Sequence, residues 1–213
     1  KQSSAKSDST LASSCWGVWQ ADDQPAMKLL ELFAGTGSVS HIAQKIDADI
    51  TSVDINVETA GYSPTIVHDL LTLAYQSLDV PDIITASPPC QTYSIMSHKH
   101  RTKDNMEPQT ADARLGLAVL EKTVEIIKYF TTLNPKLRYY IENPVGRMQY
   151  EPVLKTLPGF TMYKVTYCKF GFDYKKPTHI FTNDKSLAKL LPLPCSKANP
   201  CAVALANGGK HPV

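Results

Sequence analysis

The sequence lacks both a long hydrophobic run and a strong charge of either sign. No apolar stretch approaches the roughly 20 residues that a membrane-spanning helix needs, and the N-terminus has no signal-peptide core. Lys and Arg total 22 against 20 Asp and Glu, which gives a net charge of +2. So mild a balance permits nucleic-acid binding through a local basic patch without requiring it. The 213 residues are therefore predicted to form one soluble globular domain with short additions and no membrane partner.

Cysteine is also scarce, with five residues at positions 15, 90, 168, 195 and 201. An odd number in a chain of this size does not indicate a disulfide framework. It favours a reducing, intracellular setting, either the nucleus or the cytoplasm and nucleoid, depending on the source. Cys195, Cys201 and His211 are zinc-ligand types, but their spacing matches no standard pattern, so no metal site is predicted.

The two ends of the chain differ in composition from its middle. Residues 1–26 are polar, with Trp16 and Trp19 as their only large apolar side chains, and are predicted to be a tail or linker. The tryptophans could instead dock on the domain or on a partner. Residues 183–213 are broken by proline and glycine and are predicted to be an irregular tail. This leaves 27–182 as the folded domain.

The first motif is a strand, a glycine turn and a helix. Residues 28–33 are mostly apolar, 34–38 contain Gly35 and Gly37, and apolar residues then recur at helical spacing. This is the opening of a nucleotide-binding βαβ unit, in which glycines let the backbone approach a ligand at a helix N-terminus. Only two of the three glycines of a dinucleotide fingerprint are present, so a dinucleotide is not predicted.

Acidic residues follow the next two predicted strands. Strand 50–53 ends in Asp54, about 20 positions after the glycine turn, and strand 65–68 ends in Asp69. In open α/β sheets ligands bind at the carboxyl ends of the strands, and a carboxylate there suits a ribose. Helix capping is the alternative interpretation, and contact with a ligand is favoured for the pair.

Two later strands end at prolines and deliver a thiol and a carboxylate. Strand 83–86 is followed by Pro88-Pro89-Cys90, and two fixed φ angles hold the cysteine at the strand's carboxyl edge. Such a thiol is placed for nucleophilic attack, although a buried structural cysteine is the alternative. Strand 138–141 delivers Glu142-Asn143-Pro144, so acid and nucleophile would face one pocket.

The remaining segments are a loop, a helix and two strands. Residues 91–108 lack periodicity and carry basic residues, which fits a lid that closes on a phosphate backbone; a solvated surface loop is the alternative. Residues 113–133 form an amphipathic helix that should cover one face of the sheet. Residues 161–169 are a predicted strand, and residues 170–181 are predicted to form a turn, a basic patch and a final strand.

In this order the motifs resemble those of the C5-cytosine methyltransferase family, and its compact, phage-like members most closely. The resemblance covers 27–182 and implies a Rossmann-like class I methyltransferase fold, a mostly parallel seven-stranded sheet with helices on both faces. It implies a DNA (cytosine-5-)-methyltransferase that flips its target base and adds a cysteine to C6 of the ring before C5 is methylated. The implied catalytic residues are Cys90, Glu142, Asn143 and His179.

The resemblance also implies the binding residues. For the cofactor, S-adenosylmethionine, they are Phe33, Ala34, Gly35, Thr36, Gly37, Ser38, Asp54, Ile55, Asp69, Leu70 and Pro88. For DNA they are Gln91, Ser94, Lys99, Arg101, Lys103, Lys175 and Lys176.

Two departures from the family pattern bear on activity. His179 stands where the family has the arginine closest to the base, which predicts weaker or pH-dependent activity. The long target-recognition domain is missing, so specificity is low or is supplied by another domain or subunit. An RNA cytosine-C5 methyltransferase and a catalytically weak binding or regulatory module remain alternatives.

Overall fold

The computed structural model describes residues 25–94, 98–102 and 107–211. The predicted tail of residues 1–26 therefore lies almost wholly outside the described residues, and so does Lys103. No helix in the described part of the chain is long and apolar enough to span a bilayer.

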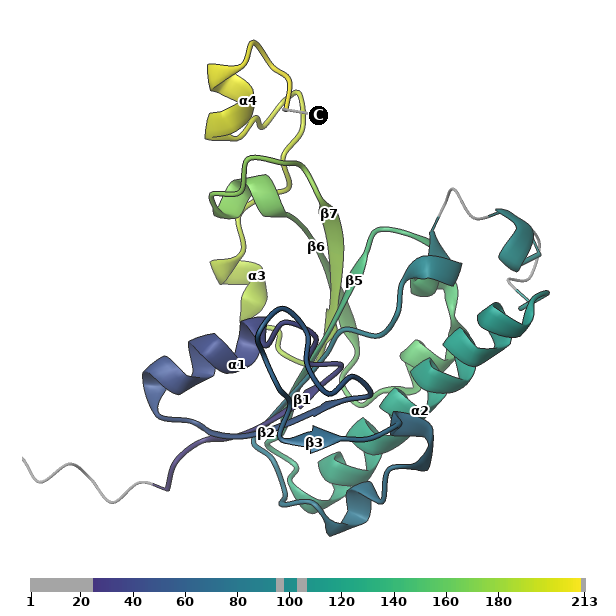
Figure 1. Cartoon of the computed structure of the whole chain (residues 1–213). Helices are drawn as coiled ribbons and strands as arrows, with labels where there is room; N and C mark the ends of the chain where they lie inside the picture. Colours follow the sequence, from purple (N-terminus) through teal and green to yellow (C-terminus); the bar gives the residue numbers. More distant parts are fainter. Residues whose placement is uncertain (1–24, 95–97, 103–106, 212–213) are drawn as a thin grey trace, which may run out of the picture.

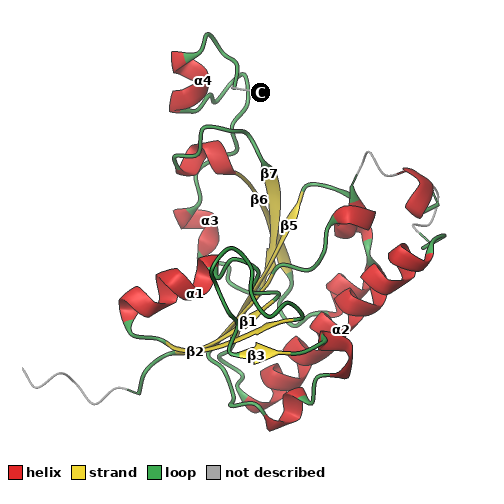
Figure 2. Ribbon diagram, in the orientation of Figure 1, coloured by secondary structure: helices red, strands yellow, loops and turns green. Residues whose placement is uncertain are grey.

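One seven-stranded sheet organises the domain (Figure 2). The strands lie in the order β3-β2-β1-β4-β5-β7-β6. Pairing is parallel from β3 to β5, whereas β7 is antiparallel to both β5 and β6. Their bounds are β1 (Lys28–Leu32), β2 (Asp49–Asp54), β3 (Ile66–Val67), β4 (Ile83–Ala86), β5 (Arg138–Pro144), β6 (Thr161–Thr166) and β7 (Pro177–Thr182).

Helices cover both faces of this sheet, with α1 on one side and α2 on the other (Figure 1). The bounds are α1 (Ser38–Ala43), α2 (Ala111–Leu133), α3 (Leu187–Leu190) and α4 (Ala202–Ala206). The strand order and the single antiparallel insertion of β7 are those of the class I methyltransferase fold. The predicted fold class is therefore confirmed.

The sequence pattern explains which strands are central. β1 and β4 are short apolar runs with both faces covered, as parallel strands between two helical layers require. Glu31 is the buried exception in β1, and its carboxylate accepts hydrogen bonds from the backbone N–H and the hydroxyl of Ser40 in α1. This contact fastens α1 to the sheet directly beneath the glycine turn.

The long helix α2 begins two residues earlier than predicted because Thr110 caps it. The Thr110 hydroxyl accepts a hydrogen bond from the Ala113 N–H over 3.2 Å. The C-terminal part of the predicted stripe is buried against the sheet, for example Ile126 and Phe130. Leu115, at the other end of the stripe, is 55% exposed.

β5 also runs further than predicted, through Pro144. It pairs with β4 only as far as Ile141, but its antiparallel register with β7 continues to Pro144↔Thr178. Proline is tolerated as a terminal strand residue because no further ladder bond depends on its missing N–H. Glu142 therefore lies within β5 but beyond the last residue that pairs with β4.

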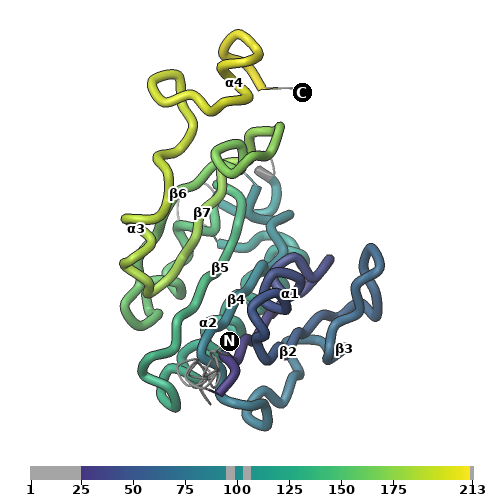
Figure 3. The backbone as a smooth tube through the Cα atoms, turned by 90° about the vertical axis from the view of Figure 1, so that its left-hand side faces the viewer, coloured from purple at the N-terminus to yellow at the C-terminus, as the bar shows by residue number. Residues whose placement is uncertain are grey.

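The C-terminal segment after β7 contains the short helices α3 and α4, and it is folded. It lies beyond the β6–β7 hairpin, with α4 at the far end (Figure 3). The Cys195 N–H donates to the Thr166 hydroxyl over 2.8 Å, which ties the segment to the end of β6. The segment is therefore irregular outside α3 and α4, and it packs against the end of β6.

Asp184, just after β7, gives a stability prediction. Hydrogen bonds from Ser186, opposed by burial and aided by Tyr140 and Arg138, hold the pKa of its carboxyl below the usual range. A depressed carboxyl pKa contributes stability that is present above the unfolded-state value and is lost as the pH falls through the folded value. Asp184→Asn should therefore lower the free energy of unfolding by about 1–2 kcal/mol at pH 7.

The measurement is urea unfolding of both proteins between neutral and acidic pH. The gap between them should shrink as the pH falls below about 4, where the unfolded-state carboxyl itself becomes protonated. A gap that stays constant across this range would show that the charge of Asp184 contributes nothing.

Candidate active site

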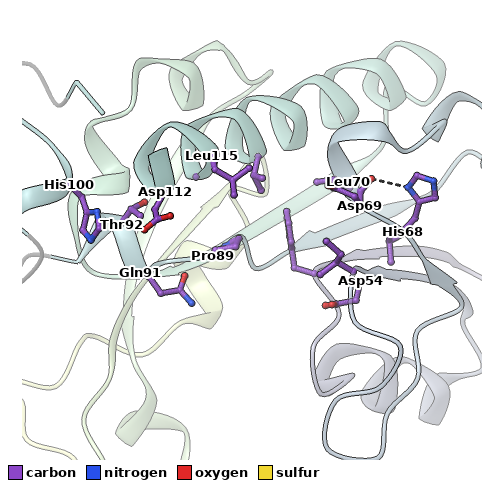
Figure 4. A pocket seen from close by; sticks show the side chains of 15 residues that line it. Asp54, His68, Asp69, Leu70, Pro89, Gln91, Thr92, His100, Asp112 and Leu115 are labelled. Atoms are coloured by element: carbon purple, nitrogen blue, oxygen red, sulfur yellow. Dashed lines mark hydrogen bonds between the residues drawn. The ribbon is translucent and has the colours of Figure 1, made fainter. Parts of the chain in front are cut away.

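A cavity of about 500 Å³ lies beyond the carboxyl ends of β1, β2 and β3, and the N-terminal half of α2 closes its other side (Figure 4). This is the edge at which open α/β sheets bind ligands. Its walls come from the strand ends, the segment after β4 and α2. The lining residues are Phe33, Val53, Asp54, Ile55, His68, Asp69, Leu70, Pro89, Gln91, Thr92, His100, Asp112, Leu115, Gly116 and Val119.

The glycine turn supports this cavity more than it lines it. Of the predicted turn residues only Phe33 is on the wall, with its backbone at a φ of 60°. The Gly35 N–H donates to Asp54 Oδ2 over 2.9 Å, so the turn is held against the end of β2. Ala34 is buried, and the Thr36 and Ser38 hydroxyls share a 2.9 Å hydrogen bond at the surface.

Gly37 is required by both conformation and space. Its φ is 67°, and an added Cβ would lie 2.2 Å from a ring atom of Tyr62. The Tyr62 hydroxyl is itself fixed by bonds to Ser40 and Ser52, so the ring cannot move aside freely. We expect Gly37→Ala to cost about 2–3 kcal/mol in unfolding free energy.

Thermal or urea unfolding measures this cost, and Gly61→Ala is the matched control. Gly61 also has a positive φ, 82°, but no atom lies near its added Cβ. The control isolates the backbone strain, so the difference between the two variants reports the clash with Tyr62. Equal losses in both would contradict the steric part of the prediction.

Asp54 and Asp69 both reach the cavity, and both also serve the backbone. Asp54 Oδ1 accepts from the Asn56 N–H over 2.9 Å, while Asp69 Oδ1 caps the 3₁₀ turn at Leu70–Thr72 through the Leu71 N–H over 3.0 Å. Capping and a place at the cavity are therefore not exclusive for Asp69. Ile55 is 65% exposed on the same wall, which leaves an apolar surface beside the carboxylates.

The two prolines before Cys90 have different surroundings. Pro89 lines the cavity, whereas Pro88 is buried and its carbonyl oxygen accepts a 3.0 Å hydrogen bond from Asn143 Nδ2. Asn143 is itself buried in β5, directly after Glu142. This bond ties the strand that carries the carboxylate to the turn that carries the thiol.

Cys90 and Glu142 therefore lie beyond the last residue pair between the adjacent strands β4 and β5, at one edge of the sheet. β4 and β5 are parallel and in register up to Ala86↔Ile141, so the residues that follow diverge from neighbouring positions. Cys90 is partly exposed and unoxidised, at the start of the 3₁₀ turn Gln91–Tyr93. A partly exposed thiol beside a cavity suits reaction with a ligand better than a role in core packing.

Glu142 is surrounded by two groups that the sequence analysis did not pair with it. The Tyr167 hydroxyl donates to Glu142 Oε1 over 3.1 Å, and Lys176 Nζ lies 3.3 Å from the same oxygen. Burial raises the pKa of Tyr167, so its hydroxyl keeps the proton that it donates. Burial alone would lower the pKa of Lys176, but Glu142 and Tyr167 outweigh it and raise the pKa.

The structure separates His179 from Glu142. In the β5–β7 register Asn143 pairs with His179, whereas Glu142 pairs with Ile180 and Pro144 with Thr178. Directly paired residues share a face and successive residues alternate, so His179 lies on the face opposite Glu142. Burial and the charge of Lys164 lower the pKa of His179, which keeps the ring neutral at pH 7. Lys176 and Thr178, not His179, share a face with Glu142.

Arg101 was predicted to contact DNA, and the structure corrects this. Its side chain is only 1% exposed, forms an ion pair with Glu151 and lies 4.1 Å from the centre of the Tyr93 ring. A guanidinium held in this way cannot reach a phosphate. Of the other residues predicted to bind DNA, Gln91, Lys99 and Lys175 are exposed, and Ser94 and Lys176 are partly buried.

Sequence reasoning missed two groups of residues near the site. The N-terminal half of α2 was read as a sheet cover, yet Asp112, Leu115, Gly116 and Val119 line the cavity. Gly116 permits this packing, because an added Cβ would lie 2.8 Å from the Thr92 hydroxyl. The second group is three adjoining rings, Tyr167, Phe172 and Tyr174, with centroids 5.2–6.2 Å apart. The sequence signal that could have revealed this group is the concentration of aromatic residues between positions 167 and 174.

Comparison with solved structures gives distant likenesses, of which three follow. Precorrin-6y C5,15-methyltransferase from Geobacter metallireducens is 13% identical over 75% of this chain and 80% of that one, with a TM-score of 0.47. A SAM-dependent methyltransferase from Agrobacterium tumefaciens is 18% identical over 75% and 56%, also at 0.47. Magnesium protoporphyrin IX methyltransferase from Synechocystis, solved with bound SAM, is 12% identical over 75% of this chain and 71% of that one, with a TM-score of 0.43. Because these TM-scores are below 0.5, the fold is assigned from the strand order and the strand pairing instead.

No curated protein matches the chain. The family comparison is more specific, because the model of the C-5 cytosine-specific DNA methylases matches residues 27–113. This range contains the glycine turn, Asp54, Asp69 and Cys90, all at the sheet edge described above. The match over residues 27–113 agrees with the family resemblance that the motifs indicated.

Proposed function

We propose that the chain transfers a methyl group from S-adenosylmethionine to C5 of cytosine in DNA, with Cys90 as the nucleophile. The observation that carries the proposal is the Asn143–Pro88 hydrogen bond of 3.0 Å. It fixes the strand of Glu142 to the turn of Cys90, beside the cavity that Asp54 and Asp69 line. A thiol, a carboxylate and a nucleoside-sized cavity at one edge are what this chemistry needs.

S-adenosylmethionine is the cofactor that the family match implies, and the cavity residues fit it. The Asp54 and Asp69 carboxylates can accept hydrogen bonds from ribose hydroxyls, while Ile55, Leu70 and Leu115 offer apolar surface to a purine. When bound, the cofactor supplies an electrophilic methyl group on a sulfonium. Phe33 forms the wall of the cavity at the end of β1.

Cys90 makes the target carbon reactive. Its thiolate adds to C6 of the cytosine, which forms an S–C6 bond and shifts the ring electrons toward N3. In its protonated form the Glu142 carboxyl, held by Tyr167 and Lys176, donates a hydrogen bond to N3 and offsets the charge that builds there; it retains this proton when that charge returns to the ring. C5 can then accept the methyl group. Loss of the C5 proton to water restores the C5–C6 double bond and expels the Cys90 thiolate.

The base must leave the duplex to reach Cys90, which costs a few kcal/mol. Exposed Lys99 and Lys175, together with Gln91, can recover part of this through contacts with the DNA backbone. Lys176 and Thr178 lie on the same face as Glu142, so they replace His179 as the residues next to the flipped base. Sequence recognition is proposed to come from a further domain or subunit.

The three-ring group offers stacking surface for a base beside Glu142. Phe172 and Tyr174 are each nearly half exposed, and Tyr167 connects them to the carboxylate. Stacking of a base on an aromatic side chain contributes about 1–3 kcal/mol. Phe172→Ala should therefore weaken DNA binding by roughly tenfold or more, measured by fluorescence anisotropy. Phe170→Ala is the control, since Phe170 is equally exposed but is not one of the three rings. Equal effects of the two variants would contradict a specific stacking role.

Covalent trapping tests the proposal directly. With S-adenosylmethionine present, an oligonucleotide with fluorine in place of the C5 hydrogen cannot complete the reaction, so the enzyme stays attached. A denaturation-resistant adduct on DNA that is absent in Cys90→Ser supports the proposal. An adduct that forms on RNA alone would show that RNA, and not DNA, is the substrate. No adduct on either, with the cofactor still bound, would overturn the catalytic proposal in favour of a methyltransferase-like binding module.

A further inference from the structure

The C-terminal segment brings three cysteines and a histidine to one point. Cys168 lies in the 3₁₀ turn η8 (Tyr167–Phe170) after β6, Cys195 in the loop after α3, Cys201 at the start of α4, and His211 near the chain end. Their three sulfur atoms and a ring nitrogen of the histidine all lie within 4.8 Å of one another. We propose that these four residues bind one zinc ion in a closed structural site. The proposal departs from the sequence-based prediction of no metal site.

The separations match a tetrahedral ligand set. Zn–S bonds of about 2.3 Å and Zn–N bonds of about 2.0 Å place tetrahedral ligand atoms roughly 3.5–3.8 Å apart. His211 Nε2 lies 3.1 Å from Cys201 Sγ and 3.8 Å from Cys195 Sγ. Small adjustments therefore suffice for coordination. Three thiols with one imidazole is a ligand set that selects zinc over the harder cations.

Packing alone does not explain how this segment stays folded. Its buried residues form a cluster of their own, made of the three cysteines and Ala204 with Val203 against it. The larger apolar side chains nearby, Leu190, Leu193 and Leu205, are more than two-thirds exposed. So small a core offsets little of the entropy lost on ordering some 25 residues, and a structural zinc ion would add its binding free energy to the stability of the folded state.

A disulfide fits these residues less well. All three cysteines are free thiols, and any single pairing would leave the third thiol and the imidazole converging on nothing. The arrangement around one point is that of a ligand set and not of a crosslinked pair.

Hydrogen bonds around the cluster hold the ligands in place, as outer contacts do in metal sites. The Ala204 N–H donates to Cys201 Sγ over 3.3 Å, which stabilises a thiolate. The Cys195 backbone is held by Thr166. Lys169 Nζ donates to Asn199 Oδ1 over 3.1 Å and to the Pro200 carbonyl over 2.9 Å. These bonds hold η8 against the loop between Cys195 and Cys201.

The site would link the chain end to the candidate active site. Cys168 directly follows Tyr167, whose hydroxyl holds Glu142. A zinc ion at Cys168 would thus fix the turn from which Tyr167 projects.

The test is the zinc content of the full chain, purified under reducing conditions and measured by mass spectrometry. We expect one zinc per chain in the wild type and in Cys90→Ser, a thiol control outside the cluster. Cys195→Ser, Cys201→Ser and His211→Ala should each bind zinc at least about tenfold more weakly. Full zinc retention in a Cys195→Ser/Cys201→Ser double variant, or equal loss in Cys90→Ser, would overturn the proposal.

Cobalt substitution covers the case in which the variants do not fold. Co²⁺ added to metal-free wild-type chain should give a thiolate-to-cobalt charge-transfer band and the strong visible bands of a tetrahedral site, and zinc should abolish both. A folded wild-type chain that binds neither ion, or one with a Cys195–Cys201 disulfide under reducing purification, would overturn it. Neither result depends on methyl transfer, so this test and the trapping test fail independently.

Discussion

Replacing Cys90 by serine should lower DNA methylation by at least about a thousandfold while leaving the affinity for S-adenosylmethionine within about twofold. The hydroxyl is a far weaker nucleophile than the thiolate at neutral pH, so the adduct at C6 would not form. Cofactor affinity should persist because Cys90 does not line the cavity; its neighbours Pro89 and Gln91 do.

The measurements are transfer of a labelled methyl group to DNA and calorimetric binding of the cofactor. Ser87→Ala is a matched control, because it removes an exposed hydroxyl from the same turn and should keep activity within about twofold. Methylation by Cys90→Ser at the wild-type rate would refute the nucleophile. Loss of cofactor binding along with activity would mean that the variant disturbs the fold instead.

Removing Arg101 should have the largest effect on stability. Its side chain is fully buried, pairs with Glu151 and donates to the Ala113 carbonyl over 3.3 Å. Arg101→Met leaves the Glu151 carboxylate buried without its partner, which typically costs 3–5 kcal/mol, so we expect a loss of about 4 kcal/mol in unfolding free energy. Urea unfolding measures it.

The double variant Arg101→Met/Glu151→Leu should regain much of that loss, because it removes both buried charges together. Lys99→Met, two residues away and exposed, should change stability by less than about 0.5 kcal/mol. If Arg101→Met kept its stability but bound DNA more weakly, the phosphate-contact role first predicted for Arg101 would be restored.

The error over Arg101 shows what a linear sequence hides. In the sequence it stands in a basic run with Lys99 and Lys103, and nothing local separates it from them. Its burial depends on Glu151, 50 residues away in the segment after β5, and on Tyr93 in the segment after β4, which only the tertiary packing brings together. A charged residue is buried only where a distant partner offsets its desolvation, and no local pattern reports that partner.

His179 illustrates a second kind of error, one of register. The family resemblance aligns residues 175–179 with an arginine motif, and a shift of one position moves a side chain to the other face of a strand. The observed pairing Glu142↔Ile180 puts Lys176 and Thr178 beside the acid and turns His179 away. Only the antiparallel ladder between β5 and β7 fixes that parity.

The sequence by itself determined the elements whose signals are local. The glycine turn, the strand ends at Asp54, Asp69 and Cys90, and the long helix are set by φ preferences, apolar periodicity and proline, which act over a few residues. Parallel strands then bring their carboxyl ends to one edge, so the outline of the site followed as well.

Only the tertiary structure decided which distant side chains meet. It brought the N-terminal half of α2 to the cavity, Tyr167 and Lys176 to Glu142, and Cys168 to Cys195, Cys201 and His211. The last group joins residues up to 43 positions apart across two loops and a hairpin, which is why the spacing along the chain matched no zinc pattern. Contacts of this kind depend on the sum of all packing and pairing energies, and no short segment of the chain encodes them.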